Sequence, residues 1–223
     1  MTATISKPKI SNWETSNIPN LVGKTALITG ANSGLGYYTA KALAEKNAHV
    51  IIACRSLEKS NLTIKKLTAL NPKGKYTPLE LDLSNLKNVV EVQTQIFNDF
   101  ENLDLLINNA GIMHPPKTLS AQGYEIQFAV NHLAHMLLTL KLLPIIEKKE
   151  ESRIVTVTSG AQFFGKVGWE NLKAENYYKF IVFGRSLEYY PPRLVNLVMK
   201  HYPRSRILVF YTGDACFNNS GGP

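Results

Sequence analysis

The sequence predicts a single α/β domain built on a doubly wound parallel sheet with helices on both faces. Two observations lead to this prediction. Short apolar runs alternate with segments of helical periodicity along the 223 residues, which is the pattern of repeated strand–helix units. A glycine-rich turn also joins the first apolar run to the first helix. Such sheets bind ligands beyond the carboxyl ends of their strands, where turns of this kind lie.

We expect six strands, each a short apolar run bounded by turn residues. Their predicted ranges are 24–30, 48–54, 76–81, 103–108, 152–158 and 205–211. The first helix is expected from Tyr37 to Asn47. The clearest helix is 84–100, where Ser84 is the predicted N-cap and apolar residues recur at helical spacing. Residues 1–20 are expected to form an N-terminal extension, and residues 21–223 a single domain.

The composition is that of a soluble globular protein, with 44% hydrophobic and 19% charged residues. The net charge of +8 fits lysine-rich helix faces and a phosphate-rich cofactor, and no nucleic-acid motif accompanies it. Cys54 and Cys216 form no metal-spaced cluster. The first 20 residues lack the apolar core of a signal peptide, and the apolar stretch 128–146 carries polar residues. We therefore expect a cytoplasmic protein without a membrane span or a nucleic-acid partner.

The turn after the first strand has the spacing G-x-x-x-G-x-G. Glycines allow a tight turn and a close approach of the backbone to a pyrophosphate, and the helix N-terminus that follows favours an anion. The alternative is a glycine-rich turn without a ligand. The candidate cofactor-binding residues of the turn are Gly30, Asn32, Ser33, Gly34, Leu35 and Gly36.

Four further motifs follow the turn in order. They are Asp82-Leu83 after the third strand, Asn108-Asn109-Ala110-Gly111 after the fourth, Asn131 in the next helix and Ser159 at the end of the fifth strand. Together with the turn they resemble the short-chain dehydrogenase/reductase family from about Val22 to Ser159. Three further segments resemble one branch of this family, that of retinol dehydrogenases and light-dependent protochlorophyllide reductases. They are Gly123-Tyr124-Glu125, Gln127-Phe128 and Asn131-His132-Leu133.

This resemblance implies a Rossmann-type fold, an NADP(H) cofactor and a small carbonyl or alcohol substrate. It places Asp82 and Leu83 near the adenine and Asn109, Ala110 and Gly111 along the nicotinamide ribose. It implies that Asn131 kinks its helix and holds a water in a proton relay, and that the Ser159 hydroxyl binds the substrate oxygen. Each residue also has a structural alternative: a helix-entry turn for Asp82, a buried amide for Asn131 and a polar strand end for Ser159.

The end of the second strand indicates a preference for NADP over NAD. NAD-preferring relatives keep an acidic residue there for the ribose 2′-hydroxyl, and this chain has Cys54 followed by Arg55. A guanidinium suits a 2′-phosphate. The alternative is a surface arginine that ends a strand.

The family's acid/base pair, Tyr-x-x-x-Lys, is absent after Ser159. In one alignment Tyr189 is the tyrosine and Arg193 replaces the lysine, with two prolines between them. In the other, Phe183-Gly184-Arg185-Ser186-Leu187 occupies the place and both catalytic side chains are lost. The candidate catalytic residues are therefore Ser159, Tyr189, Arg193 and Asn131.

The C-terminal part also departs from the family. Thr212-Gly213 stands where relatives have Pro-Gly, and the sequence ends ten residues later, at Pro223. We therefore expect the seventh strand of the relatives, which is their last, and the substrate-covering helices to be missing. The leading hypothesis is an impaired NADP-dependent oxidoreductase. The alternatives are a non-catalytic nucleotide-binding remnant and a protochlorophyllide reductase-like enzyme that reduces a double bond. Relatives commonly dimerise through the helices at 122–142 and 180–201, so the resemblance also implies a homodimer.

A metal site is not expected. His132 and His135 have metal-ligand spacing but lack a third ligand, which favours core positions for both histidines.

Overall fold

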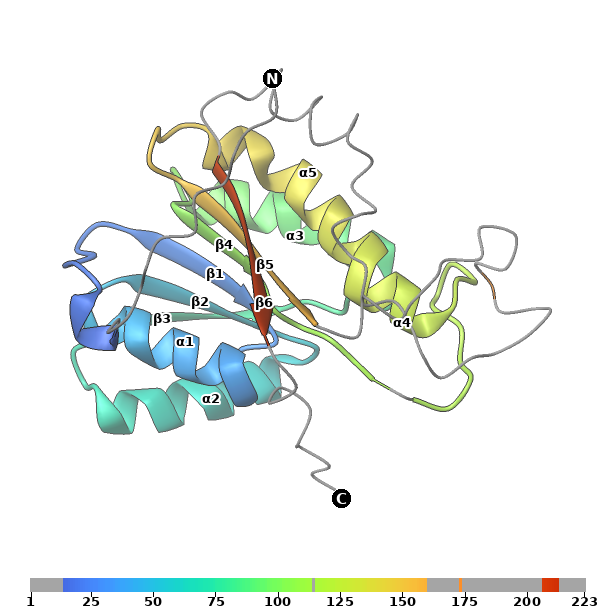
Figure 1. The fold of residues 1–223 in the computed structure, drawn as a ribbon, viewed down its shortest axis with the longest axis horizontal. Helices are drawn as coiled ribbons and strands as arrows, with labels where there is room; N and C mark the ends of the chain where they lie inside the picture. The colour runs from blue at the N-terminus through green and yellow to red at the C-terminus, as the bar shows by residue number, and fades with distance from the viewer. Residues whose placement is uncertain (1–13, 114, 160–172, 174–205, 213–223) are drawn as a thin grey trace.

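Six parallel strands form one sheet in the computed structural model, which describes residues 14–113, 115–159, 173 and 206–212. The strands lie in the order β3-β2-β1-β4-β5-β6 (Figure 1). Their bounds are β1 Thr25–Thr29, β2 His49–Cys54, β3 Lys75–Glu80, β4 Leu105–Asn108, β5 Arg153–Ser159 and β6 Arg206–Thr212. All six strands predicted from the sequence are present, with bounds that differ by no more than two residues.

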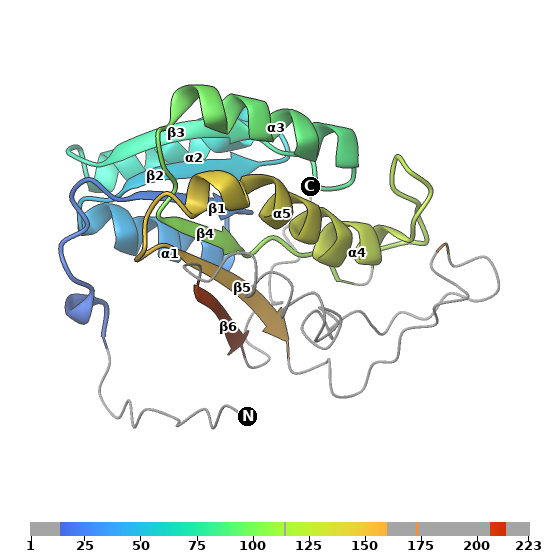
Figure 2. The same ribbon diagram turned by 90° about the horizontal axis from the view of Figure 1, so that it is seen from above.

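Helices cover both faces of the sheet, as the doubly wound prediction requires (Figures 1 and 2). α1 (Gly34–Glu45) and α2 (Leu57–Leu70) lie on one face, and α3 (Leu86–Asp99) and α5 (Ala134–Ile146) lie on the other. The neighbours Leu27 and Ile28 of β1 enter different core clusters because successive side chains of a strand point to opposite faces. Leu27 belongs to the cluster of α3 and α5, and Ile28 to that of α1 and α2.

The first helix begins at Gly34, three residues before the predicted start at Tyr37. The last residues of the glycine-rich turn form its first turn, with the Tyr37 N–H donating to the Ser33 carbonyl at 3.2 Å. Ser33, which is the N-cap, has an extended backbone. The turn and the helix N-terminus are therefore one structural unit.

The predicted N-cap of α3 is wrong by one residue. Asn85 is the N-cap, and its Oδ1 accepts a hydrogen bond from the Lys87 N–H at 3.1 Å. Ser84 instead donates to Asp82 Oδ1 from both its backbone N–H, at 2.9 Å, and its hydroxyl, at 2.7 Å. The Ser84 side chain thus belongs to the turn before the helix, where its hydroxyl donates to Asp82, and the capping acceptor is Asn85.

An irregular helix crosses the face of the sheet from Ile126 to Ile146. It consists of α4 (Ile126–Phe128), the π-helical segment η2 (Ala129–Leu133) and α5. By length and composition this helix could cross a membrane, with a mean hydropathy of 1.4. The prediction that its polar residues make it too polar for a membrane span is therefore wrong on composition alone. However, 61% of this window is buried inside the protein, and α5 contributes Leu138 and Leu142 to the core. A buried core helix passes the same composition test.

A short 3₁₀ turn, η1 (Thr15–Asn17), precedes the sheet. The Lys46 ammonium donates to the Ser16 carbonyl at 2.9 Å, which ties this turn to the end of α1. The part of the predicted N-terminal extension that the structure describes is thus attached to the domain.

Candidate functional site

The sequence motifs meet at the carboxyl ends of the central strands. The strand order reverses between β1 and β4, because β2 and β3 lie to one side and β5 and β6 to the other. Ligands in such sheets bind in the crevice at this switch point. The turn that starts at Gly30 follows β1, Arg55 follows β2, and Asn109 follows β4.

Two glycines of the turn are required by packing. Gly30 has φ +67°, and a Cβ there would lie 2.9 Å from the Ala110 Cα. A Cβ on Gly36 would lie 2.5 Å from both the Gly30 carbonyl oxygen and Asn109 Nδ2. Side chains at these positions would push the turn away from the segment after β4. The absence of a side chain at both glycines therefore allows the two loops to pack closely.

Gly34 differs from these two glycines. It has φ +54°, and a Cβ there would meet no described atom within 4 Å. Among the described residues, Ser33 finds no partner for a side-chain capping bond to α1, and Asn32, Ser33 and Leu35 are all exposed. The N-terminal N–H groups of a helix without such a cap are available to an anion, and the helix dipole favours it. The turn therefore has the form of a phosphate cradle open to solvent.

The tip of β2 combines a buried thiol with exposed cations. Burial raises the pKa of the Cys54 thiol, so the group is uncharged at neutral pH. The thiol also interacts with Ser60, with the backbone of Asn32 and Ala31 in the glycine turn, and with the charge of Lys59. Lys59 lies in the first turn of α2, four residues after Arg55 in the sequence, and both residues are exposed. Arg55 was predicted from the sequence and Lys59 was not, although a second cation four residues after Arg55 could have suggested it.

The Asp82 carboxylate takes part in the turn between β3 and α3. Besides its two bonds from Ser84, the Asp82 N–H donates to Asn88 Oδ1 at 2.7 Å. Leu83 is buried in the core beside α3. The structural alternative for Asp82 is therefore observed, and a contact of Asp82 or Leu83 with an adenine stays a prediction.

The segment Asn109–Gly111 is fixed to the end of β1 by Thr29. The Thr29 hydroxyl accepts hydrogen bonds from the backbone N–H groups of Asn109 and Ala110, each at 2.9 Å. Asn109 Nδ2 donates to the Thr29 carbonyl at 2.9 Å. Thr29 is a site residue that the sequence analysis missed, although its place directly before the glycine turn was a signal.

The Asn131 side chain binds the backbone just beyond this segment. Its Oδ1 accepts from the Ile112 N–H and its Nδ2 donates to the Ile112 carbonyl, both at 2.9 Å. Asn131 lies in the π-helical segment Ala129–Leu133, and π-bulges frequently mark functional sites. The Asn131 side chain thus orients the chain after β4, and its role in a proton relay stays a prediction.

His132 and His135 occupy core positions, as the sequence favoured. The His132 ring is buried and stacks on Phe128 with ring centroids 5.4 Å apart. His135 is buried between the sheet and its helix, and burial lowers its pKa to about 4. Within the described ranges, no group of three or more His, Cys, Asp or Glu side chains is placed to hold a metal ion.

The catalytic candidates are only partly placed. Ser159 is the last residue of β5, in register with Thr212 of β6, at the carboxyl end of the sheet where the other motifs meet. Tyr189, Arg193 and the competing segment 183–187 lie outside the described residues. Their catalytic roles stay predictions.

Comparison with known proteins decides the family. The profile of short chain dehydrogenases matches residues 24–174. This chain belongs to the short-chain dehydrogenase family. It is 36% identical to Retinol dehydrogenase 11 of Mus musculus over 89% of this chain and 61% of that protein. It is 38% identical to Retinol dehydrogenase 14 of Mus musculus over 81% of this chain and 58% of that protein. The predicted resemblance to the retinol dehydrogenase branch is confirmed, and the chain spans about three fifths of these relatives' length.

Solved structures of similar proteins support the same fold. A protein of unknown function from Mycobacterium paratuberculosis is 31% identical and has a TM-score of 0.78, over 92% of this chain and 74% of that one. A metagenomic short-chain oxidoreductase in complex with NADP is 22% identical and has a TM-score of 0.68, over 88% and 85% of the two chains. The predicted Rossmann-type fold is therefore confirmed.

Proposed function

We propose that this chain is an NADP-dependent oxidoreductase that interconverts a small carbonyl compound and an alcohol by hydride transfer. The observation that carries the proposal is the open N-terminus of α1 at the switch point of the sheet. A Cβ on Gly34 would meet no described atom within 4 Å, and Ser33 makes no capping bond among the described residues. A pyrophosphate would complete these donors and would interact favourably with the helix dipole.

The tip of β2 supports NADP over NAD. The buried Cys54 thiol is neutral and cannot repel a 2′-phosphate. Arg55 and Lys59 supply two positive charges beside it, and Glu58 supplies one exposed negative charge in the same helical turn. The charge balance thus favours an anionic ribose substituent. The NADP named in the structure of the metagenomic relative points in the same direction.

The roles of the remaining residues follow from the family resemblance. Bound NADP(H) would supply or accept the hydride. The Ser159 hydroxyl would hydrogen-bond the substrate oxygen, and Tyr189 would give or take its proton, supported by the charge of Arg193. The Thr29, Asn109 and Asn131 contacts would hold the chain after β4 in place along the nicotinamide ribose.

Calorimetric titration with NADPH and NADH tests the cofactor assignment directly. We expect NADPH to bind more tightly, and Arg55→Ala to weaken NADPH about tenfold while leaving NADH nearly unchanged, because one charge-assisted contact to phosphate is lost. Lys66→Ala is the matched control, since Lys66 is also an exposed cation and lies further along α2. Equal affinities for the two cofactors, or an equal effect of both variants, would contradict the proposal.

A non-catalytic nucleotide-binding protein is the second candidate, favoured by the absence of Tyr-x-x-x-Lys after Ser159. Arginine in place of lysine keeps the charge but changes its geometry. Loss of acid/base assistance costs about 10²–10⁴-fold in rate, so we expect bound NADPH with weak turnover. NADPH oxidation with a panel of aldehydes and ketones, beginning with retinal because of the named relatives, measures this. Rapid turnover that disappears in Tyr189→Phe would refute the non-catalytic candidate.

A further inference from the structure

The Thr29 hydroxyl lies at the centre of four polar contacts. Its Oγ1 is 2.9 Å from each of three nitrogens, the backbone N of Asn109 and of Ala110 and the Nε2 of His135. The Ile107 carbonyl oxygen is further away, at 3.5 Å. Thr29 is fully buried and His135 is 3% exposed, so water does not compete for these contacts.

This arrangement determines which nitrogen of His135 carries the proton. A hydroxyl has one proton and two lone pairs. The N–H groups of Asn109 and Ala110 occupy the two lone pairs, because a backbone N–H can only donate. The hydroxyl proton therefore points to His135 Nε2, the nearer of its two possible acceptors, and Nε2 must be unprotonated.

The other ring nitrogen then acts as a donor. A neutral imidazole with a bare Nε2 carries its proton on Nδ1. His135 Nδ1 lies 3.3 Å from the backbone carbonyl oxygen of Asn131, to which it donates. That carbonyl belongs to the π-helical segment, and the Asn131 side chain holds Ile112. His135 thus links the end of β1, the segment after β4 and the irregular helix.

We propose that His135 is a positioning residue, which orients the Thr29 hydroxyl and thereby holds the Asn109–Ala110 backbone in the geometry that receives the nicotinamide end of the cofactor. The proposal rests on the proposed function, because it assumes that NADP(H) lies along this segment. His135 acts through Thr29 and Asn131 and touches no reacting atom.

The charge state of the ring agrees with this role. Burial and, to a smaller extent, the nearby His132 lower the pKa of His135 to about 4, although its hydrogen bond to the Asn131 backbone acts in the opposite direction. The ring is therefore neutral near pH 7 and remains an acceptor for Thr29. A protonated Nε2 would aim a third donor at an oxygen whose two lone pairs are already engaged.

Three variants separate positioning from mere filling of the core. His135→Leu keeps an apolar side chain of similar volume and removes both polar atoms. His135→Gln can place an amide oxygen near the former Nε2 and accept from Thr29. His132→Leu is the matched control, the same substitution three residues earlier at another buried position of the helix.

NADPH titration of the folded variants gives the first readout. Since an unsatisfied buried hydroxyl and loosened N–H groups cost about tenfold or more in binding, we expect this loss in His135→Leu. We expect His135→Gln to recover most of the affinity and His132→Leu to keep it. Circular dichroism and thermal melting confirm that each variant is folded. Wild-type affinity in His135→Leu, or no recovery in His135→Gln, would overturn the proposal.

Nuclear magnetic resonance of the protein without cofactor gives the second readout. The ¹⁵N shifts of the His135 ring should show a protonated Nδ1 and a bare Nε2 at neutral pH. Hydrogen exchange at the Asn109 and Ala110 amides should be faster in His135→Leu and near wild type in His135→Gln. The opposite tautomer, or unchanged exchange, would overturn the role of His135 alone. A wild-type protein that binds no NADPH would instead refute the proposed function.

Discussion

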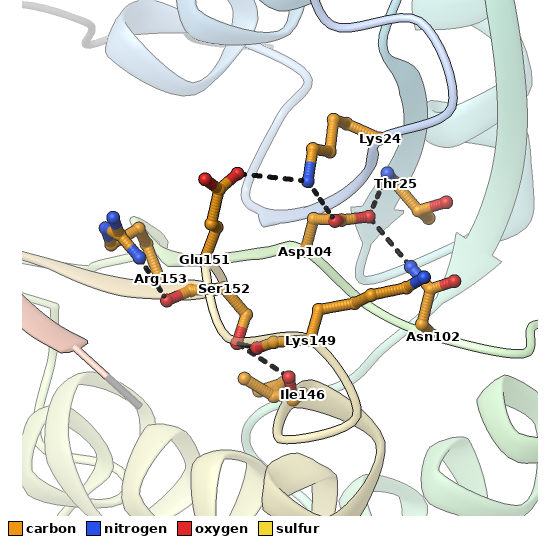
Figure 3. Close-up of polar contacts among 9 residues, drawn as sticks. All are labelled: Lys24, Thr25, Asn102, Asp104, Ile146, Lys149, Glu151, Ser152 and Arg153. Carbon is orange, nitrogen blue, oxygen red and sulfur yellow. Dashed lines mark hydrogen bonds and ion pairs between the residues drawn. The ribbon is translucent and has the colours of Figure 1, made fainter. Parts of the chain in front are cut away.

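The two ends of the parallel sheet use polar groups in different ways. At the amino end, the buried Asp104 carboxylate accepts from the Thr25 N–H at 2.9 Å and from Asn102 Nδ2 at 2.8 Å, and it pairs with the Lys24 ammonium at 3.0 Å (Figure 3). Lys24 also reaches Glu151 at 3.7 Å. At the carboxyl end, the residues around Ser33 and Gly34 are exposed and the α1 N-terminus has no side-chain cap among the described residues.

This difference between the two ends separates polar groups that stabilise the fold from polar groups that are available to a ligand. Donors and acceptors that satisfy one another inside the protein stabilise the fold, because each would otherwise be buried without a partner. Ser152 illustrates this at the amino end, where its hydroxyl bonds the Ile146 and Lys149 carbonyls at 2.6 and 2.8 Å (Figure 3). Donors left open to solvent contribute little to stability and remain available to a ligand. Substitutions at the two ends should therefore have separable effects.

Asp104→Ala should give the largest loss of stability. It leaves the Thr25 N–H and the Asn102 amide without their acceptor and Lys24 without its buried partner, at a cost of about 4 kcal/mol. Asp104→Asn keeps one acceptor and should cost about half as much. Urea unfolding measures both values. NADPH affinity of the folded protein should not change, and a parallel loss of affinity would contradict the separation of the two ends.

Acid should destabilise the protein through its buried histidines. The folded-state pKa of His135 is about 4 and the ordinary value is 6.5. Between these pH values the unfolded chain binds more protons than the folded protein, so the free energy of unfolding falls as the pH falls. For this one group the loss reaches about 3 kcal/mol at pH 4.

The histidines with lowered pKa values can be told apart by substitution. Burial also lowers the pKa of His49 and His132, which adds to the same trend. Urea unfolding from pH 7 to 4.5 should therefore show a shallower slope in His135→Gln than in the wild type. An identical slope would show that His135 does not carry the largest share.

Gly36→Ala should disturb the carboxyl end by displacing two loops. The added Cβ would lie 2.5 Å from the Gly30 carbonyl oxygen, which belongs to the backbone and cannot rotate away. Overpacking of this kind costs about 1–3 kcal/mol, and the shifted turn should lose NADPH binding. Urea unfolding and NADPH titration would check both effects. A variant with wild-type stability and affinity would show that the contact between the loops is looser than the structure indicates.

Lys59→Ala should have the smallest effect of the series. Lys59 is exposed and lies near the Cys54 thiol, so we expect it to add only a screened attraction for the 2′-phosphate. NADPH affinity should fall about threefold at low salt and less at high salt. Titration at two salt concentrations measures this. An unchanged affinity at low salt would limit the phosphate interaction to Arg55.

The sequence predicted the sheet well because strands are local features. Each apolar run bounded by turn residues gave one strand, and the motifs were correctly placed at the strand ends. The contacts inside the site were harder to predict. Thr29 and His135 are separated by 106 residues, and no local pattern shows that they meet. The cap of α3 was misplaced because Ser84 and Asn85 are adjacent and both are good capping residues, so the sequence alone does not show which of them accepts from the helix N-terminus.

Two glycines allow the most direct test of the central claim, that the open turn after β1 binds the cofactor phosphates. Gly34 at the carboxyl end has φ +54° and Gly23 at the amino end has φ +79°, and a Cβ on either would meet no described atom within 4 Å. Asparagine tolerates this backbone region, so Gly34→Asn and Gly23→Asn should cost similar stability, about 1 kcal/mol. The measurement is NADPH titration of both variants. We predict that Gly34→Asn weakens NADPH about tenfold or more and that Gly23→Asn does not. Equal affinities in the two folded variants would contradict the claim.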